Sequence, residues 1–291
     1  MQTNNTIAVN NPATGTLIAE VKSYSVSEGI TALKKSKIAQ TKWAALPIKE
    51  RIVFLKKFQH LLVEAAEELC ELLAKENGKP VGEAMIMEVL PVVDLTAYFC
   101  KKAPKILKNK KISMHLVKYR KSYIHYKPKG VVYVISPWNF PFAIPTGEII
   151  MALIAGNSVI HKPASITPLI ALKTRELLLK TGIDPDLYQV LPMSGAEAFQ
   201  LIREGVDYVN FTGSTSVGEK VAAECGRLFI PCSMELGGKD PAIVCEDAHI
   251  DHAAESLVWG AFANAGQVCA SVERAYVHAS IYDQVVEKVV A

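Results

Sequence analysis

A cysteine and a glutamate in glycine-rich surroundings are the side chains of this sequence best suited to acyl chemistry. Cys269 ends the run NAGQVC (264–269), and Glu235 opens the run ELGGK (235–239). A thiol among small residues can be reached by a substrate, and backbone that contains two glycines can be approached closely by a ligand. Cys269 is therefore a candidate nucleophile and Glu235 a candidate base. Because many free cysteines are only small buried hydrophobes, the role of Cys269 has to be judged from the neighbouring motifs.

An asparagine follows directly after the apolar run 131–135. That run ends abruptly at Ser136-Pro137, which predicts a buried strand that stops at its carboxyl edge, where open α/β sheets bind their ligands. Between Trp138 and a second proline, Asn139 would be held stiffly and could donate an amide N–H to a developing oxyanion. The alternative role for Asn139 is to cap a turn.

Two further segments place cations or hydroxyls after predicted strands. The string KPAS (162–165) follows the short apolar strand 159–161, and FTGS (211–214) leads into a predicted helix over 215–225. A lysine, hydroxyl groups and a helix N-terminus all favour phosphate. Each segment alone could also be a capped strand-to-helix turn.

Taken together, these five motifs resemble the aldehyde dehydrogenase superfamily, and the resemblance covers essentially the whole chain. It implies oxidation of an aldehyde to a carboxylic acid with NAD or NADP, through a thiohemiacetal and a thioester on Cys269. It also implies that the Asn139 amide and the Cys269 backbone N–H hold the oxyanion, and that a partly desolvated Glu235 activates the hydrolytic water. The cofactor contacts carried over from the family are Ser136, Pro137, Trp138, Lys162, Pro163, Ala164, Ser165, Gly195, Phe211, Thr212, Gly213, Ser214, Gly218 and Leu236.

The resemblance also bears on cofactor and substrate. Family members often carry a glutamate where this chain has Ser165, and a neutral Ser165 leaves Lys162 free to pair with the 2′-phosphate of NADP. NADP is therefore expected alongside NAD. The KPAS string is common among semialdehyde-oxidising members, which makes succinate semialdehyde the first candidate substrate. The CoA-acylating branch lacks the glutamate found at 235, so hydrolysis is favoured.

The fold class is predicted from the alternation of strands and helices between 130 and 232. Strands at 131–135, 159–161, 188–191 and 208–211 alternate with helices at 144–155, 168–181, 196–203 and 215–225. This order is typical of an α/β fold with a doubly wound parallel sheet. G-x-G-x-x-G is absent, but the resembled family uses a Rossmann variant that lacks it. We expect a dinucleotide-binding domain over 1–236 and the beginning of a catalytic domain over 237–291.

The first hundred residues are helical in pattern. Ser25 and Ser27 before Glu28 predict a helix start, and a long amphipathic helix is expected from Pro47 to the glycine stop at Asn77-Gly78. A third helix is expected over 81–107, interrupted at Pro91. No chemistry is expected from these segments.

A basic stretch over 101–129 contains eleven lysines and arginines interleaved with tyrosines. Such a pattern can bind nucleic acid, but it is more typical of a solvated face. The resemblance implies a protruding hairpin at about 113–129 that joins subunits of a homo-oligomer, so no nucleic-acid partner is expected.

Two other motifs are near misses. The run 213–220 has the glycine spacing of a P-loop, but Glu219 occupies the position of the required lysine, which argues against an NTPase. His249 and His252 could be read as a metal pair, but they lack a third ligand and are more typical of a polar helix start beside Asp247 and Asp251. No metal is expected.

Composition sets the remaining limits. The chain has 291 residues, is 50% hydrophobic and 21% charged, and carries a net charge of +3, which favours a globular fold and no general polyanion binding. Its six cysteines form no CxxC pair and no signal peptide is apparent, so the cytoplasm is expected. No apolar run is long enough to span a bilayer.

The chain ends soon after Cys269, whereas members of the resembled family continue well beyond their cysteine. Two alternatives follow: a piece of a longer enzyme, or a truncated remnant or interaction module without catalysis. In either case apolar residues near the end are expected to lie open to water, among them Leu257, Val258, Phe262, Val285 and Val289. The isolated chain is expected either to aggregate or to fray after about Gly266.

Overall fold

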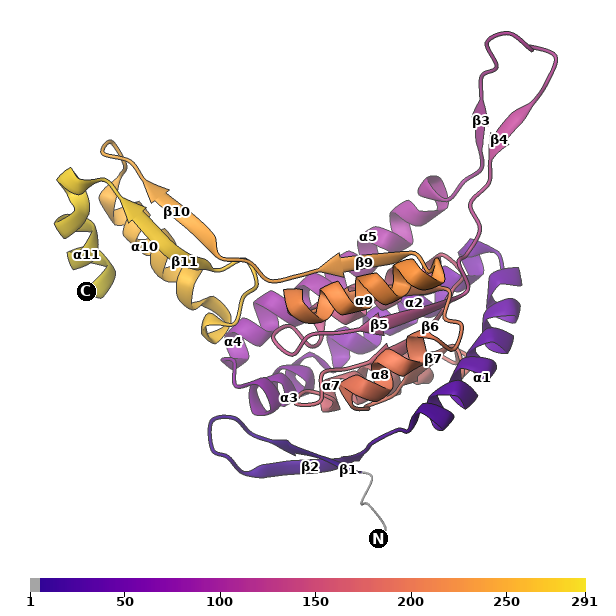
Figure 1. Cartoon of the computed structure of the whole chain (residues 1–291), viewed down its shortest axis with the longest axis horizontal. Coiled ribbons are helices and arrows are strands. Elements are labelled where there is room, and N and C mark those ends of the chain that lie inside the picture. Colours follow the sequence, from indigo (N-terminus) through magenta and orange to yellow (C-terminus); the bar gives the residue numbers. More distant parts are fainter. Residues whose placement is uncertain (1–5) are drawn as a thin grey trace.

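A five-stranded parallel sheet forms the centre of the computed structural model, which describes residues 6–291 (Figure 1). Its strands, in spatial order, are β7 (Tyr188–Val190), β6 (Ser158–Lys162), β5 (Val131–Ile135), β8 (Tyr208–Thr212) and β9 (Cys232–Glu235). All neighbouring strands are parallel. The chain starts in the middle, builds outward to β7, and then crosses β5 to add β8 and β9. The predicted doubly wound α/β sheet is thus confirmed, and its switch point lies between β5 and β8.

Helices cover both faces of this sheet. The helices that connect its strands are α6 (Ala143–Ile154), α7 (Leu169–Lys180), α8 (Gly195–Ile202) and α9 (Thr215–Leu228). Alternate residues of β5 enter different cores: Val132 and Val134 pack with α6 and α7, and Val131 and Tyr133 pack with α8 and α9. Because both faces are buried, the strand is a continuous apolar run in the sequence, which is why its predicted bounds match the observed ones.

The N-terminal part begins with a hairpin that the sequence reading did not predict. Its elements are β1 (Thr6–Asn10), β2 (Leu17–Lys22), α1 (Val26–Ala45), α2 (Ile48–Glu64) and α3 (Ala66–Asn77). Ser25 and Glu28 form the expected capping box at the start of α1. The single long helix expected from Pro47 was wrong, because the chain bends at Ala65, where neither glycine nor proline marks the break. Gly78 ends α3 with φ +84°, as predicted.

The third predicted helix is present but contains a wide turn. It consists of α4 (Val81–Ala84), the π-helical turn η1 (Met85–Val89) and α5 (Leu90–Ile106). The N–H of Leu90 donates to the carbonyl of Met85, and Pro91 follows within the first turn of α5. The predicted interruption therefore precedes Pro91, which has no N–H to continue the helical ladder.

The basic segment forms a hairpin that projects from the body of the molecule (Figure 1). Its antiparallel strands are β3 (Lys110–Ile112) and β4 (Ser122–Ile124). The first strand thus lies just before the predicted range of 113–129, and the second strand lies inside it.

A smaller unit follows the sheet, and Figure 1 shows it beyond the end of β9. Its elements are β10 (Asp240–Val244), α10 (Ile250–Phe262), the 3-10 turn η2 (Ala263–Gly266), β11 (Val272–Val277), the 3-10 turn η3 (Ala279–Ile281) and α11 (Tyr282–Val290). The parallel strands β10 and β11 share a small core with α10 and α11. Leu257 and Val285 are buried in that core, so their expected exposure was wrong, whereas Val258 and Phe262 are exposed.

Candidate active site

The carboxyl ends of the central strands surround a cavity of about 610 Å³. It lies at the switch point between β5 and β8, the place where a doubly wound sheet binds its ligand. Most of the residues predicted for the cofactor line it: Ser136, Pro137, Trp138, Lys162, Ala164, Ser165, Gly195, Phe211, Thr212, Gly213, Ser214 and Leu236. Two predicted contacts, Pro163 and Gly218, do not, and Pro163 is buried behind the rim.

Gly218 has a packing role behind the cavity wall. A Cβ at this position would lie 2.4 Å from Cδ2 of Leu236 and 3.2 Å from Cε1 of Phe211, and both of these side chains line the cavity. The glycine in α9 therefore lets the wall pack against the helix without contacting the contents of the cavity itself.

A buried cation at the cavity wall makes the site suitable for an anion. Lys162 is 9% exposed, and among residues 6–291 its ammonium has no ion pair or hydrogen bond. Burial lowers the pKa of the Lys162 amine. A buried cation with no acid beside it is stabilised by any negative group that enters the cavity. The N-cap of α9, Ser214, lies at the cavity rim and makes no side-chain capping bond. The first N–H groups of that helix therefore have no side-chain acceptor from their N-cap and are suited to an anion.

A chain of polar side chains, which the sequence reading missed, lies beneath this cavity. The hydroxyl of Ser136 is 2.7 Å from Nε2 of His161, and Nδ1 of His161 is 2.9 Å from the hydroxyl of Tyr188. Burial, with a contribution from Lys162, lowers the pKa of His161 to about 3, so its imidazole is neutral at pH 7. This arrangement fixes the orientation of Ser136 at the cavity wall.

Cys269 and Asn139 lie at the border between this cavity and a second one. The second cavity has a volume of about 260 Å³ and shares Trp138, Asn139, Gly237 and Cys269 with the first. Cys269 is exposed. The structure therefore brings the predicted nucleophile and the predicted oxyanion donor together, with space on both sides of them.

The loop before Cys269 has an unusual backbone. Asn264 and Ala265 adopt positive φ values of 57° and 56°, in the left-handed region that non-glycine residues rarely occupy. The side chain of Asn264 is fully buried and donates both to the carbonyl of Asn139 and to that of Gln267, each at 3.0 Å. The Asn139 amide also donates to the Gln267 carbonyl at 3.0 Å. The cysteine loop is thus tied directly to the predicted oxyanion donor.

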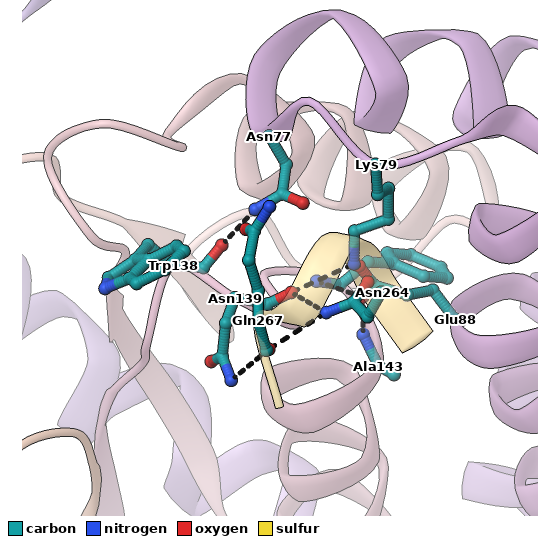
Figure 2. A network of polar contacts seen from close by, with 9 residues as sticks. Asn77, Lys79, Glu88, Trp138, Asn139, Ala143, Asn264 and Gln267 are labelled. Atoms are coloured by element: carbon teal, nitrogen blue, oxygen red, sulfur yellow. Dashed lines mark hydrogen bonds and ion pairs between the residues drawn. The ribbon is translucent and has the colours of Figure 1, made fainter. Parts of the chain in front are cut away.

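Residues from the N-terminal helices complete this network, contrary to the expectation that those segments carry no chemistry (Figure 2). Lys79 donates to the Asn139 carbonyl at 2.9 Å and forms a buried ion pair with Glu88. Asn77 donates to the Trp138 carbonyl at 2.7 Å. One feature of the sequence indicates this network. Glu88 is the only charged residue in the apolar run 84–93, and a lone charge in such a run requires a partner.

Glu235 differs from the prediction. It ends β9 and precedes Leu236, but its side chain is exposed and lines neither cavity. The expected partial desolvation is therefore absent. A half-buried carboxyl group nearby, with one oxygen fully buried, belongs instead to Glu148 of α6. Its pKa is raised to about 8 by burial and, to a smaller extent, by the Glu235 carboxylate, while the Thr212 hydroxyl opposes the shift. Sequence reasoning had not singled out Glu148.

The near-miss motifs have structural explanations. Thr215 begins α9, so the P-loop-like run is a strand-to-helix turn. His249 is the N-cap of α10 and its Nδ1 accepts from the His252 N–H at 3.3 Å, as the helix-start interpretation indicated. Within residues 6–291 there is no cluster of three metal-ligating side chains. The helices of that range include none with the length and apolarity to cross a bilayer.

The doubly wound sheet, with a cysteine and an asparagine between two cavities at its switch point, defines a ligand-binding α/β protein with a candidate nucleophile. A model of the aldehyde dehydrogenase family matches residues 1–291. The chain belongs to the aldehyde dehydrogenase family.

Relatives and solved structures agree with this assignment. A protein of Mycolicibacterium smegmatis named "Putative succinate-semialdehyde dehydrogenase", with NADP(+) in its name, is 37% identical over 94% of this chain and 53% of its own length. The crystal structure of an aldehyde dehydrogenase from Brucella melitensis biovar abortus 2308 has a TM-score of 0.94 at 35% identity, covering 98% of this chain and 59% of that one. An aldehyde dehydrogenase of Bacillus cereus, solved as its NAD+ complex, has a TM-score of 0.93 at 32% identity, covering 98% and 58%. The chain spans about half the length of the curated relatives it matches.

Proposed function

We propose that this chain carries the cofactor cleft and the nucleophile of an enzyme that oxidises aldehydes to carboxylic acids with NAD+ or NADP+. The observation that carries the proposal is the position of Cys269 and Asn139 between a large cavity and a smaller one beside them. The larger cavity is lined by the buried Lys162, which has no ion pair within residues 6–291. The larger space suits a dinucleotide with its phosphates, and the smaller one suits an aldehyde.

The first chemical step uses Cys269. Its thiolate attacks the aldehyde carbon, and the new C–S bond leaves an alkoxide on the former carbonyl oxygen. The second N–H of the Asn139 amide, the first being bonded to Gln267, and the backbone N–H of Cys269 are the donors for this oxyanion. Lys162, Ser165 and the N-terminus of α9 would hold NAD(P)+ in the cleft, where it would supply the hydride acceptor needed to oxidise the adduct to a thioester.

The cofactor would be held by the side chains around the larger cavity. Lys162 and Ser165 are suited to the ribose and to a 2′-phosphate, because they provide a cation and a hydroxyl with no carboxylate to repel that phosphate. The N-terminus of α9 at Ser214 is suited to the pyrophosphate. Both NAD+ and NADP+ are therefore proposed.

Hydrolysis of the thioester is assigned to Glu235. Because its carboxylate is exposed and lines neither cavity, we infer that it moves toward Cys269 before it deprotonates the attacking water. The products are the carboxylic acid and a free Cys269 thiol.

The finer assignments follow from family membership. We propose residues 1–236 as the dinucleotide-binding domain and 237–291 as the beginning of the catalytic domain. Succinate semialdehyde is the first candidate substrate, supported by the name of the M. smegmatis relative. The projecting hairpin β3–β4 is proposed to join subunits of a homo-oligomer, and the cytoplasm remains the proposed location.

The test is aldehyde-dependent reduction of NAD+ and NADP+ by the purified chain, followed by absorbance of the reduced nicotinamide, with cofactor affinity measured separately. Ser165→Glu should shift the preference toward NAD+ by about tenfold, because a carboxylate repels the 2′-phosphate. Cofactor binding without any aldehyde-dependent reduction would instead favour the alternative of a non-catalytic chain.

A further inference from the structure

A buried ion pair lies next to the candidate active site without lining either cavity. The side chains of Lys79 and Glu88 are both 0% exposed. Burial lowers the pKa of the Lys79 amine and raises that of the Glu88 carboxyl, and the attraction between the two groups opposes both shifts. Such a pair is a weak source of stability, because the desolvation of two charges offsets most of their attraction. A different reason for its presence has to be found in its contacts.

The contacts show that the pair holds both ends of one short segment. Lys79 donates to the carbonyl of Asn139 at 2.9 Å, and its ammonium lies 4.7 Å from the centre of the Phe140 ring. Glu88 accepts from the backbone N–H groups of Phe142 and Ala143, at 2.9 and 2.7 Å, where α6 begins. The cation thus fixes the start of segment 139–143 and the carboxylate fixes its end.

The same carbonyl of Asn139 connects the pair to the nucleophile. Its second hydrogen bond comes from Asn264, which also donates to the carbonyl of Gln267, two residues before Cys269. The Asn139 side chain closes the ring by donating to that Gln267 carbonyl. Figure 2 shows these groups converging from three separate parts of the chain. Movement of the Asn139 carbonyl would therefore change the relation between the Asn139 amide and Cys269.

We propose that Lys79 is a positioning residue: its hydrogen bond to the Asn139 carbonyl orients the Asn139 amide toward the oxyanion formed on Cys269, and Glu88 keeps the lysine in place. The inference rests on the proposed function, because it gives the Asn139 amide the task of stabilising that oxyanion. Lys79 itself touches neither the aldehyde nor the cofactor.

The decisive variant is Lys79→Met together with Glu88→Gln. Replacing only Lys79 would leave an unpaired buried carboxylate and endanger the fold, whereas the double replacement removes both charges at similar volume. It retains an amide oxygen for the N–H groups of α6 but removes the Lys79 donor, so the Asn139 carbonyl keeps only its hydrogen bond from Asn264. Glu88→Gln alone keeps that donor. Lys75→Met, in the exposed Lys75–Glu71 pair on α3, is the matched control.

The readout is reversible addition of propanal to Cys269, which needs no cofactor turnover. Propanal bound to the thiol blocks alkylation by iodoacetamide, and peptide mass spectrometry follows Cys269 and the exposed Cys245 separately. Each variant is assayed about 20 °C below its own melting temperature, so that the measurement refers to the folded chain.

We expect the double variant to need about tenfold more propanal for half-protection of Cys269, equivalent to one lost hydrogen bond in the adduct, with its alkylation rate in the absence of propanal unchanged. Glu88→Gln should lose about threefold at most, and Lys75→Met nothing. Protection of the double variant at the wild-type concentration, or equal losses in the double variant and Glu88→Gln, would overturn the role of Lys79 alone. If propanal protects wild-type Cys269 no better than Cys245, the proposed function fails and the positioning role fails with it.

Discussion

The loop that carries Cys269 and the strand end that carries Glu235 are both exposed, but they are held in different ways. The cysteine loop is anchored by Asn264 and Gln267 to the segment that contains Asn139. The Glu235 side chain makes no hydrogen bond or ion pair with any residue in the range 6–291. We infer that the proposed nucleophile has a fixed position, whereas the proposed base would be free to approach a thioester on Cys269.

The buried charges beside the two regions also differ. Next to the cysteine loop, Lys79 and Glu88 compensate one another. Next to Glu235, burial keeps Glu148 protonated at pH 7, since its pKa is raised to about 8. The cysteine loop thus lies beside an ion pair, Lys79 and Glu88, that keeps its neighbours in place. The end of β9 lies beside the protonated Glu148, which offers Glu235 no charged partner.

The largest expected effect comes from removing the nucleophile. Cys269→Ala should lower aldehyde-dependent reduction of NAD(P)+ by at least about 1,000-fold, because no other group can form the covalent adduct. Cofactor affinity, measured by fluorescence titration, should stay unchanged. Cys245→Ala is the matched control, since this thiol is also exposed. Activity of Cys269→Ala near the wild-type level would show that Cys269 is not the nucleophile, and the comparison of its loop with the strand end at Glu235 would no longer hold.

Loss of the mobile base should affect only the later step. Glu235→Gln should slow steady-state turnover by about 100-fold while the first turnover stays within about threefold of wild type, because the base acts on the thioester. Rapid mixing would show a burst of reduced nicotinamide, and intact mass spectrometry would show the accumulated acyl group. Glu246→Gln, at an exposed position in the smaller unit, is the control. A first turnover slowed as much as the steady state would place Glu235 in the addition step instead.

Weakening the anchor of the cysteine loop should have a smaller effect. Asn264→Gly preserves the backbone at φ 57° but removes both donated hydrogen bonds, so half-protection of Cys269 should require about tenfold more aldehyde. Asn264→Ala should in addition be less stable than Asn264→Gly by about 1 kcal/mol, because alanine is strained in the left-handed region. Ala265→Gly, with φ 56°, tests the backbone alone and should leave protection unchanged. If Asn264→Gly behaves like wild type, the loop is not held by this side chain.

The smallest effect on activity is expected at Glu148, where the change is one of stability and its dependence on pH. The folded-state pKa of Glu148 is raised to about 8, so the unfolded chain ionises first and the wild type loses stability as pH rises from about 4.5 to about 8. Glu148→Gln removes this loss, and its stability relative to wild type should increase by about 4 kcal/mol over that interval. Urea denaturation at pH 5 and pH 8 measures the difference. A constant difference between the two pH values would mean that Glu148 is ionised in the folded chain.

The sequence predicted the sheet well because each strand and helix is specified locally. Val131–Ile135 is apolar throughout since both faces are buried, and Gly78 ends its helix by a backbone conformation that glycine adopts without strain. The bend at Ala65 was missed because no strong local signal marks it, whereas the hairpin β1–β2 was missed although the turn NPATG (11–15) lies between two short runs that contain isoleucine and valine. The cavity lining was predicted through the family resemblance, with Pro163 and Gly218 as exceptions.

The polar network was missed for a different reason. Lys79 and Asn139 are far apart in the sequence, and their contact exists only after the helices pack on the sheet. Glu235 was expected to be desolvated because its motif suggested a base, but burial depends on what covers the end of β9. Glu148 was overlooked because an acid in a helix is usually solvated, and only the packed structure shows that it is not.

The π-helical turn Met85–Val89 has a consequence for how the length of this chain can vary. A π-turn accommodates one more residue than an α-helical turn, and each residue of an α-helix turns the chain by about 100°. Deleting one residue from 85–89 would restore a regular helix but rotate Glu88 away from Lys79, while the apolar face of α5 stayed on the core. Insertions and deletions should therefore be tolerated in the hairpin β3–β4, beyond the other end of α5, but should disrupt the π-turn, although no residue of the turn lines either cavity.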